Sequence, residues 1–541
     1  WFFQQFLKLG FAKTKYAGEY YLTWDADTLP LSHIEFFDGN HPYFTRKYEY
    51  NENYSKSYVM DIGGFPDIPG LEGPANGSEY LWADWNISGN TRWTERSESY
   101  FFRANLSYNR KYLLGFSIRR DGTSKLAKEN RYSNFPAVSA GWVISDEAFM
   151  SRQHVINLLK LRTSYGMTGS ITNVSMADCY DRLSSDIYWG KPALSVASTL
   201  GNPDLQWEKT NQVDVGVDLA LFQNRLTLIA EWYLKRTSGM MNSEPLPSST
   251  GGYTSRKINA GTIRNSGVDL ALNFQHHFTR DWGLTAGINM NINRSKVIDL
   301  PVDNWAYSSA YYGGGNTPRP RLKIGQSFGA LEMYRALGLD ERGDIIYDDV
   351  SGNGSIDAAD KVIIDNLTPK FTGGLNLGVS WKNLSLFGQF SFTYGGKIYN
   401  LDEQLLRSTE LGYDDVMKNK PDYILDRWTQ ENQSSRYPRF VVGAHGAQNE
   451  TGWNDRPSTL YLFDASFLKL NKLTLSYNLP QNWIQKLGMT SCSVYLSGEN
   501  LFTLKNKKLN VPDPEAALTS GIAQKGVPSP RSFMIGLDLT F

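Results

Sequence analysis

The sequence lacks any long apolar run, any excess of charge of one sign, and all but two cysteines. None of its apolar stretches approaches the roughly 20 residues that a membrane-spanning helix needs, which excludes helical membrane proteins. The 55 basic residues are balanced by 55 acidic ones, so the basic face that nucleic-acid binding requires is not expected. Cys179 and Cys492 lie far apart in the chain, which gives no support for a disulfide and predicts two structural thiols.

Recognisable catalytic patterns are also missing, so we predict neither an enzyme nor an organic cofactor. No glycine-rich phosphate loop follows a strand and opens a helix, and no nucleophile has the expected elbow sequence around it. The one histidine pair, His276 and His277, is a poor metal site because neighbouring strand residues point to opposite faces.

Alternation of apolar and polar residues over nine to eleven positions is the dominant pattern that is present. Aromatic residues make up 13% of the chain and glycines number 48, which suits long strands and tight turns. Short turns, such as 109–111, 222–225 and 381–383, alternate with long polar connections at 238–262, 295–370 and 396–460. Short turns at one end and long loops at the other are typical of an outer-membrane barrel.

The fold class predicted is therefore all-β, a transmembrane antiparallel β-barrel with roughly 14 spanning strands in this chain. A soluble β-sandwich is the alternative, but sandwich strands are usually shorter, about five or six residues. The final segment favours the barrel, because apolar residues alternate from Phe533 to a terminal Phe541. A chain that ends on an aromatic residue resembles the signal for outer-membrane barrel assembly.

Several ordered motifs across roughly 95–541 resemble the SusC/RagA family of TonB-dependent transporters. They include Arg131–Pro136, Glu147–Phe149, Leu158–Gly166, Leu200–Leu205 with Trp207–Thr210, a turn-like N-x-G-x-x-x-N-x-G at 259–267, Asp464–Leu470, Ser497–Phe502 and Asp513–Glu515.

The resemblance implies a bacterial outer membrane of Bacteroidetes type and a family barrel of about 22 strands. Residues 1–541 are expected to form the C-terminal portion of that barrel, in contact with outer-membrane lipid. The family's signal peptide, plug domain and TonB-contacting segment have no counterpart in this sequence, which starts at Trp1 without a leader. The resemblance further implies a SusD-like surface lipoprotein, energy supplied through TonB, and import of a glycan, with a peptide as the other substrate class.

One polar loop has the spacing of a calcium site. Oxygen-bearing residues and a sharp-turn glycine, Gly354, follow the order of a calcium loop, although serine replaces an acid at position three and aspartate replaces glutamate at position twelve. The predicted ligands are Asp349, Ser351, Asn353, Ser355, Asp357 and Asp360. The alternative is a polar turn held by aspartate and asparagine hydrogen bonds.

Aromatic residues in the long connections are candidates for ligand contacts. Trp305, Tyr311 and Tyr312 lie beside three glycines, and their rings could stack on sugars. Tryptophan and tyrosine are equally the interfacial residues of any such barrel. The other functions left open are a passive porin and a structural or adhesive surface barrel.

Overall fold

The computed structural model describes most of the chain from Glu95 onward. The described residues are 37–38, 41–42, 95–188, 191–302, 305–306, 317–365, 367–407, 422–439, 454–485, 488–517, 521–523 and 528–540. The chain divides into two compact units, Trp1–Thr94 and Glu95–Phe541. In the first unit, the short strands β1 (Phe37–Asp38) and β2 (His41–Pro42) pair antiparallel. Segments 15–24 and 43–50, whose aromatic sequences predict strands, lie outside the described residues.

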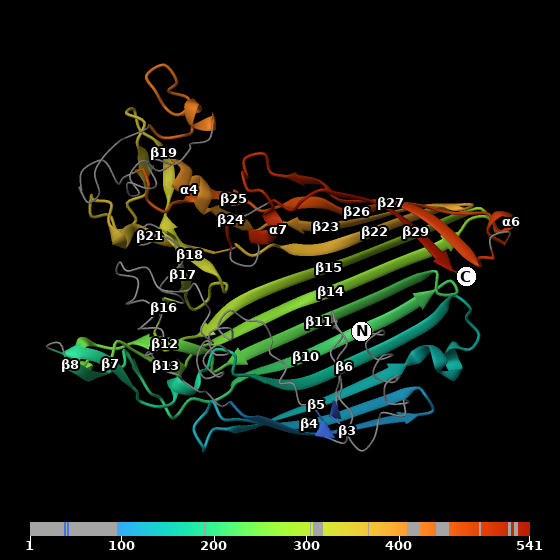
Figure 1. Cartoon of the computed structure of the whole chain (residues 1–541), viewed down its shortest axis with the longest axis horizontal. Helices are drawn as coiled ribbons and strands as arrows, with labels where there is room; N and C mark the ends of the chain where they lie inside the picture. Colours follow the sequence, from blue (N-terminus) through green and yellow to red (C-terminus); the bar gives the residue numbers. More distant parts are fainter. Residues whose placement is uncertain are drawn as a thin grey trace. The chain divides into compact units, whose positions relative to one another are not determined.

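The second unit is built on one antiparallel sheet of 13 strands (Figure 1). Each strand pairs with the sheet strand before it and the one after it in the chain, so the topology is a simple meander. In chain order the strands are β3 (Ser97–Tyr108), β4 (Tyr112–Thr123), β5 (Tyr132–Val143), β6 (Ile156–Ser170), β10 (Glu208–Leu221), β11 (Leu226–Ser238), β14 (Thr262–His277), β15 (Trp282–Asp299), β22 (Phe371–Trp381), β23 (Leu384–Tyr394), β26 (Phe467–Asn478), β27 (Ser491–Lys505) and β29 (Ser532–Thr540).

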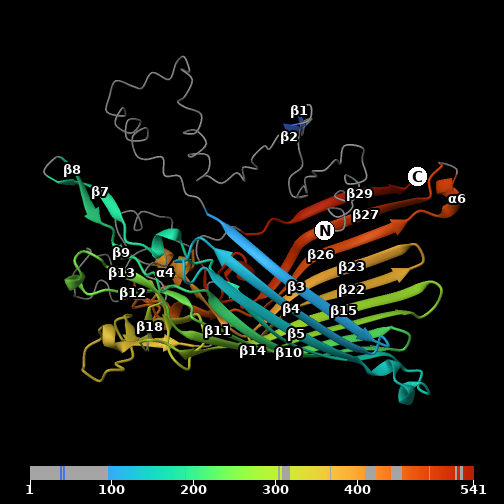
Figure 2. The ribbon, with the colours of Figure 1, turned by 90° about the horizontal axis from the view of Figure 1, so that it is seen from below.

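The strands run side by side through the sheet from β3 to β29 (Figure 2). Most are 11 to 18 residues long, which is longer than sandwich strands and confirms that part of the prediction. The roughly 14 strands predicted for the chain compare with 13 in the described sheet. No helix among the described residues is long and apolar enough to cross a membrane.

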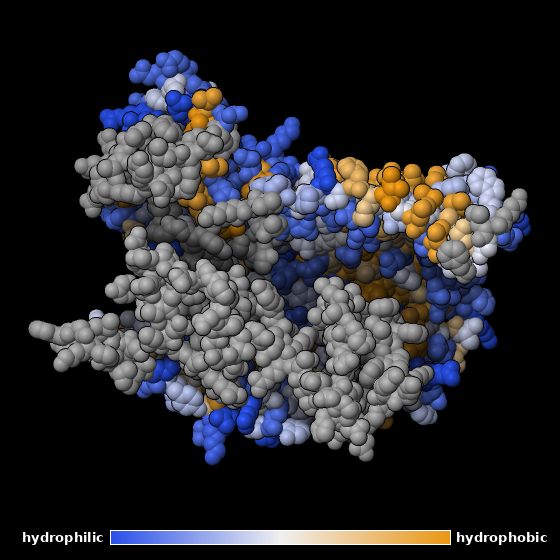
Figure 3. All heavy atoms as spheres, in the orientation of Figure 1, coloured by the Kyte–Doolittle hydropathy of each residue, from blue (hydrophilic) through white to orange (hydrophobic). Residues whose placement is uncertain are grey.

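Alternating side chains give the sheet one apolar face and one polar face. The side of the sheet that carries Leu106, Leu114, Val215, Leu377 and Leu537 is called the apolar face, and the opposite side is called the polar face. The cross-strand register keeps the apolar side chains in rows, as in Val215 opposite Trp232 and Trp232 opposite Val268. Large apolar side chains on this face are exposed, with Ile535 at 81% and Leu106 at 64%. Hydrophobic residues gather over β27 and β29 in Figure 3.

Short turns join the strands at one end of the sheet. β3 and β4 are joined through Asn109 and Arg110, whose φ angles of 51° and 59° are left-handed. Aromatic side chains collect at this short-turn end, where Tyr108 stacks on Tyr112 and Trp282 lies 6.0 Å from Trp381. Amphipathic aromatic rings in such a row are typical of a membrane–water interface.

Small sheets fold within the long connections at the other end. They are β12 (Met241–Pro245) with β13 (Ser255–Asn259) and β9 (Thr199–Leu200); β7 (Leu183–Tyr188) with β8 (Lys191–Val196); β16 (Trp305–Ala306), β17 (Arg319–Leu322), β18 (Ala330–Tyr334) and β21 (Lys361–Ile364); β19 (Ala336–Leu339) with β20 (Ile345–Tyr347); and β24 (Lys397–Asn400), β25 (Leu462–Asp464) and β28 (Ile522–Ala523). The helices α4 (Leu401–Arg407) and α7 (Pro514–Ala517) lie in these connections, with the 3-10 turns η3 (Met176–Asp178), η4 (Ser248–Thr250), η6 (Ala358–Asp360), η7 (Asp422–Asp426) and η8 (Thr459–Tyr461). At the short-turn end, the β5–β6 connection carries the 3-10 turns η1 (Ile144–Asp146) and η2 (Ala148–Met150), and the β26–β27 connection carries the short helix α6 (Gln481–Ile484).

Candidate functional site

A cluster of charges lies on the polar face, across β6, β10 and β11. Arg162 Nε lies 3.1 Å from Asp218 Oδ1, and the same guanidinium also pairs with Glu231. Lys160 Nζ lies 3.9 Å from the other oxygen of Asp218. Two cations and two anions thus balance locally, and their side chains remain 21–32% exposed. Partly exposed ion pairs of this kind keep the face polar and hydrated rather than adding much stability.

Amide side chains cover the next part of the polar face, on β15. Asn293 Oδ1 accepts from the Tyr233 hydroxyl at 3.1 Å, and the Asn291 amide donates to the same hydroxyl at 3.3 Å. Asn289 Oδ1 accepts from the backbone N–H of Gly374 at 2.8 Å. These groups are neutral donors and acceptors, and they suit contact with a polar ligand or polypeptide better than bond-breaking chemistry.

Gly267, in β14, makes the space that Tyr233 occupies on the polar face. A Cβ at Gly267 would lie 2.5 Å from the Tyr233 hydroxyl and 2.2 Å from the Ile292 carbonyl oxygen. The N-x-G-x-x-x-N-x-G stretch was expected to be a turn, and that prediction is wrong for its second half. β14 already begins at Thr262, so only Gly261, with φ 91°, sits in a turn. The second glycine serves ring packing inside a strand.

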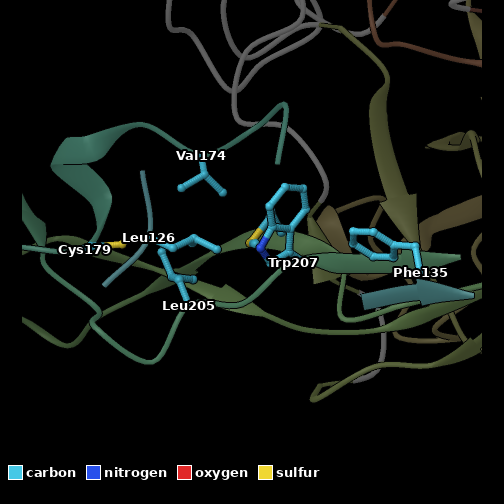
Figure 4. Packing of buried hydrophobic residues seen from close by; sticks show 7 residues of the cluster. Leu126, Phe135, Val174, Cys179, Leu205 and Trp207 are labelled. Atoms are coloured by element: carbon cyan, nitrogen blue, oxygen red, sulfur yellow. The ribbon is translucent and has the colours of Figure 1, made fainter. Parts of the chain in front are cut away.

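Several family-like motifs meet in one hydrophobic cluster at the base of the long connections (Figure 4). Trp207 packs against Phe135, with ring centroids 5.6 Å apart and the planes tilted by 66°. Its indole N–H donates to the Arg131 carbonyl at 3.0 Å. Gly169 leaves room for both rings, because a Cβ there would lie 2.2 Å from Phe135. The buried members are Leu126, Phe135, Val174, Cys179, Leu205, Trp207 and Met241.

Polar ties surround this cluster and join the same motifs. The Asn259 side chain accepts from the backbone N–H of Gln206 at 2.7 Å and donates to the carbonyls of Gln206 and Gly239, each at 2.9 Å. Lys257 Nζ pairs with Asp178 at 2.9 Å. The motif residues therefore have a structural role: they hold the long connections together where these leave the sheet. Both cysteines are buried and free, which confirms the prediction of structural thiols.

A second structural contact lies near the β29 edge of the sheet, between β26 and the connection that follows β27. Lys469 Nζ lies 2.8 Å from Asp513 and 3.0 Å from Glu515, and the lysine side chain is only 7% exposed. Asp513 also accepts from the Ser529 hydroxyl at 2.7 Å. The Asp464–Leu470 and Asp513–Glu515 motifs thus meet through one buried lysine.

Glu147 joins three donors at the short-turn end. Its carboxylate accepts from Tyr112 at 2.7 Å, from the Trp142 indole at 3.0 Å, and from Lys111 at 3.1 Å. These hydrogen bonds, that of Tyr112 foremost, lower the pKa of Glu147 from its ordinary value of 4.5 to about 2. The resemblance drew attention to this glutamate, but two of its partners, Lys111 and Tyr112, are 36 and 35 residues away in sequence and could not be predicted.

Replacing Glu147 with glutamine should lower stability in a pH-dependent way. Because the folded pKa is depressed, the carboxylate stabilises the fold above about pH 5, and this contribution is lost as the pH falls toward 2. Urea unfolding midpoints of wild type and Glu147→Gln should therefore differ at neutral pH and converge in acid. Asp146→Asn is the matched control, because the side-chain contact of Asp146 is a long one, 3.4 Å from its neighbour Ser145. A gap that persists unchanged near pH 2 would contradict the assignment.

The predicted calcium loop closes on its own hydrogen bonds. Asp349 accepts from the backbone N–H groups of Gly352 at 2.7 Å and Gly354 at 2.9 Å. Buried Asp360 accepts from those of Ser351 at 2.9 Å and Asp357 at 2.7 Å. These N–H groups lower the pKa of Asp360. In the part of the chain that the structure describes, no three His, Cys, Asp or Glu side chains are placed to share a metal ion.

The contacts match the alternative, a turn held by aspartate and asparagine side chains. Of the other predicted ligands, Asn353 donates its amide to Asp357 at 3.1 Å and accepts from the backbone N–H of Ser355 at 2.8 Å. Ser351 Oγ donates to Asp349 at 3.2 Å. The six residues are thus brought together in one loop, but as each other's partners, and calcium binding stays a prediction.

The aromatic ligand candidates are mostly untested. Tyr311 and Tyr312 lie outside the described residues, and Trp305 is described only as part of β16, opposite Leu322. His276 and His277 end β14 with different cross-strand partners, Leu284 and Gly283. The His276 ring packs 4.8 Å from Phe278, as expected for a strand residue rather than a paired metal ligand.

Comparison with known proteins agrees with this geometry. Residues 3–501 match the family described as TonB dependent receptor-like, beta-barrel. A TonB-dependent receptor named P3 from Formosa agariphila is 28% identical over 82% of this chain and 45% of its own length. The TonB-dependent receptor SusC of Bacteroides thetaiotaomicron is also 28% identical, over 82% of this chain and 43% of its own. The solved RagAB peptide transporter superposes with a TM-score of 0.69 at 28% identity, covering 83% of this chain and 48% of that one.

The exposed apolar face, the polar face behind it and the row of aromatics define an outer-membrane β-barrel protein. The chain belongs to the TonB-dependent receptor-like β-barrel family and resembles its SusC and RagA members. It spans about half the length of the relatives it matches.

Proposed function

We propose that this chain is the barrel part of a TonB-dependent importer of a polar nutrient, working with a SusD-like surface lipoprotein. The observation that carries the proposal is the polar face, in a chain of this family. Its balanced charges around Arg162 and its amides on β15 suit the passage of a polar solute without holding a net charge of one sign. Energy for the import would come through TonB.

The substrate class we favour from the sequence is an oligosaccharide, with a peptide as the second candidate. Aromatic residues in the connections support the first, because aromatic faces stack on sugar rings. The relative RagAB, described as a peptide transporter, supports the second. Hydroxyl and amide groups on the polar face offer hydrogen bonds to either class.

Growth on defined nutrients tests the proposal. A strain deleted for the gene should lose growth on one class, oligosaccharides or peptides, and regain it when the gene is restored. A second strain that lacks TonB should lose the same growth. Growth that needs the gene but not TonB would indicate a passive porin. Unchanged growth on both classes, with lost surface attachment, would indicate a structural or adhesive barrel.

We also propose that the 349–360 loop takes calcium, which would order the connection between β15 and β22. The oxygen-bearing side chains gathered in this loop support the proposal, although their present contacts are with one another and with the loop backbone. Calcium should raise the thermal midpoint of the purified protein relative to a chelator, and Asp349→Asn should abolish the rise. Asp402→Asn, a carboxylate on α4 outside this loop, is the control. If calcium does not shift the thermal midpoint of the wild type, the loop is a turn held by its own hydrogen bonds and not a calcium site.

A further inference from the structure

A groove lies on the apolar face, between β3 and β10, toward the short-turn end. Its volume is about 970 Å³, at the upper end of the roughly 300–1,000 Å³ of small-molecule sites. The side chains of the apolar face that line it include Tyr112, Leu114, Ala140, Trp142, Thr163 and Val215.

Two small side chains produce the hollow. Ala140 and Thr163 are direct cross-strand partners on β5 and β6. Leu114 continues their row on one side and Val215 on the other. The Thr163 hydroxyl donates to the Asp214 carbonyl at 3.0 Å, so the one polar atom of this pair is already hydrogen-bonded. The floor of the groove is therefore apolar, even though one of its residues is a threonine.

The end of the groove nearest the short turns is held rigidly. Tyr112 and Trp142 are cross-strand partners, and both donate to the same oxygen of Glu147, at 2.7 and 3.0 Å. The adjoining β3–β4 turn carries Arg110 and Lys111, of which Lys111 also pairs with Glu147 at 3.1 Å. Fixed aromatic rings with cationic residues beside them resemble the surroundings of a lipid headgroup at a membrane interface.

We propose that this groove binds one acyl chain of a phospholipid, whose phosphate lies at the β3–β4 turn. The groove is continuous with the apolar face, and that face contacts lipid in an outer-membrane barrel. Short turns lie on the periplasmic side of such barrels, so the lipid belongs to the periplasmic leaflet. A lipid of the other leaflet would carry its headgroup at the opposite edge of an apolar band roughly 25 Å tall. The proposal rests on membrane location and not on transport.

Native mass spectrometry of the protein, expressed from its complete gene and purified in mild detergent, tests the site. The wild type should retain one tightly bound phospholipid. Ala140→Phe and Thr163→Phe each fill the groove and should lower its occupancy about tenfold, since each buried methylene of an acyl chain adds measurable affinity. Ala286→Phe is the matched control, because Ala286 lies on the apolar face of β15, opposite Phe274 and Leu377, away from the groove.

Heat-modifiable electrophoretic mobility, compared between heated and unheated samples, identifies the variants that fold. If Ala140→Phe does not fold, Thr163→Phe is used to test the groove. Three results would overturn the proposal: a wild type without bound phospholipid, equal retention in the folded groove variants, or equal loss in Ala286→Phe. The proposal would also be overturned if the wild type were a dimer that only the groove variants dissociate, because the occupant of the groove would then be a second barrel.

Discussion

Replacing Trp207 with alanine is expected to cost about 3–5 kcal/mol of stability, the range for a buried tryptophan. The indole is 9% exposed, packs against Phe135, and donates to the Arg131 carbonyl. Its removal opens a cavity and leaves that carbonyl without its indole donor at the base of the long connections. We therefore expect a lower urea midpoint and faster proteolysis within 170–208 and 238–262 in the detergent-purified protein.

Trp232→Ala is the control for this variant. Trp232 lies on the apolar face of β11 and is 44% exposed. Its truncation removes contacts mostly with lipid or detergent, so a smaller change in the urea midpoint is expected and the connections should stay resistant to protease. Equal changes in urea midpoint and in proteolysis for the two tryptophan variants would contradict the role of the Trp207 cluster in stabilising the long connections.

Replacing Gly267 with valine is expected to lower the free energy of unfolding by about 1–3 kcal/mol, the range for overpacking. Any Cβ at this position meets the Ile292 carbonyl oxygen and the Tyr233 hydroxyl at distances that real Cβ atoms do not show. The Tyr233 ring must then leave the polar face and lose its hydrogen bond to Asn293. Chemical unfolding in detergent measures the cost.

Ala271→Val is the matched control for Gly267→Val. Ala271 lies on the same strand and face, where its cross-strand partners are Ile229 and Asn289. Its larger side chain should change the free energy of unfolding by less than about 0.5 kcal/mol, as most substitutions at open positions do. If both variants lose the same stability, the close packing of Tyr233 on Gly267 is not the reason that valine destabilises this strand.

The spanning strands could be predicted because their pattern is local. Alternation together with turn residues placed the hairpins at 109–111 and 222–225, and the structure has β3–β4 and β10–β11 there. Lys382 and Asn383 likewise join β22 to β23. Cross-strand neighbours in a meander are close in sequence, so each hairpin can be recognised by itself.

The contents of the long connections could not be predicted in the same way. The sheet of β12, β13 and β9 unites strands of two to five residues, one of them from a different connection. The strands of such sheets are too short to show a period, and their partners are distant in sequence. For the same reason, the sequence did not show that Glu147 contacts Lys111 and Tyr112, or that Lys469 contacts Asp513 and Glu515. Gly267 was misassigned to a turn because glycine marks a close approach inside a strand as readily as a turn.

Purification from native membranes, followed by mass spectrometry of every co-purifying chain, tests the proposed importer most directly. The account predicts a stoichiometric surface lipoprotein of SusD type, together with peptides of the same polypeptide that precede Trp1 and form a plug. A barrel that purifies alone, with Trp1 as the first residue of the polypeptide in the cell, would contradict energised import and leave a pore or a structural protein.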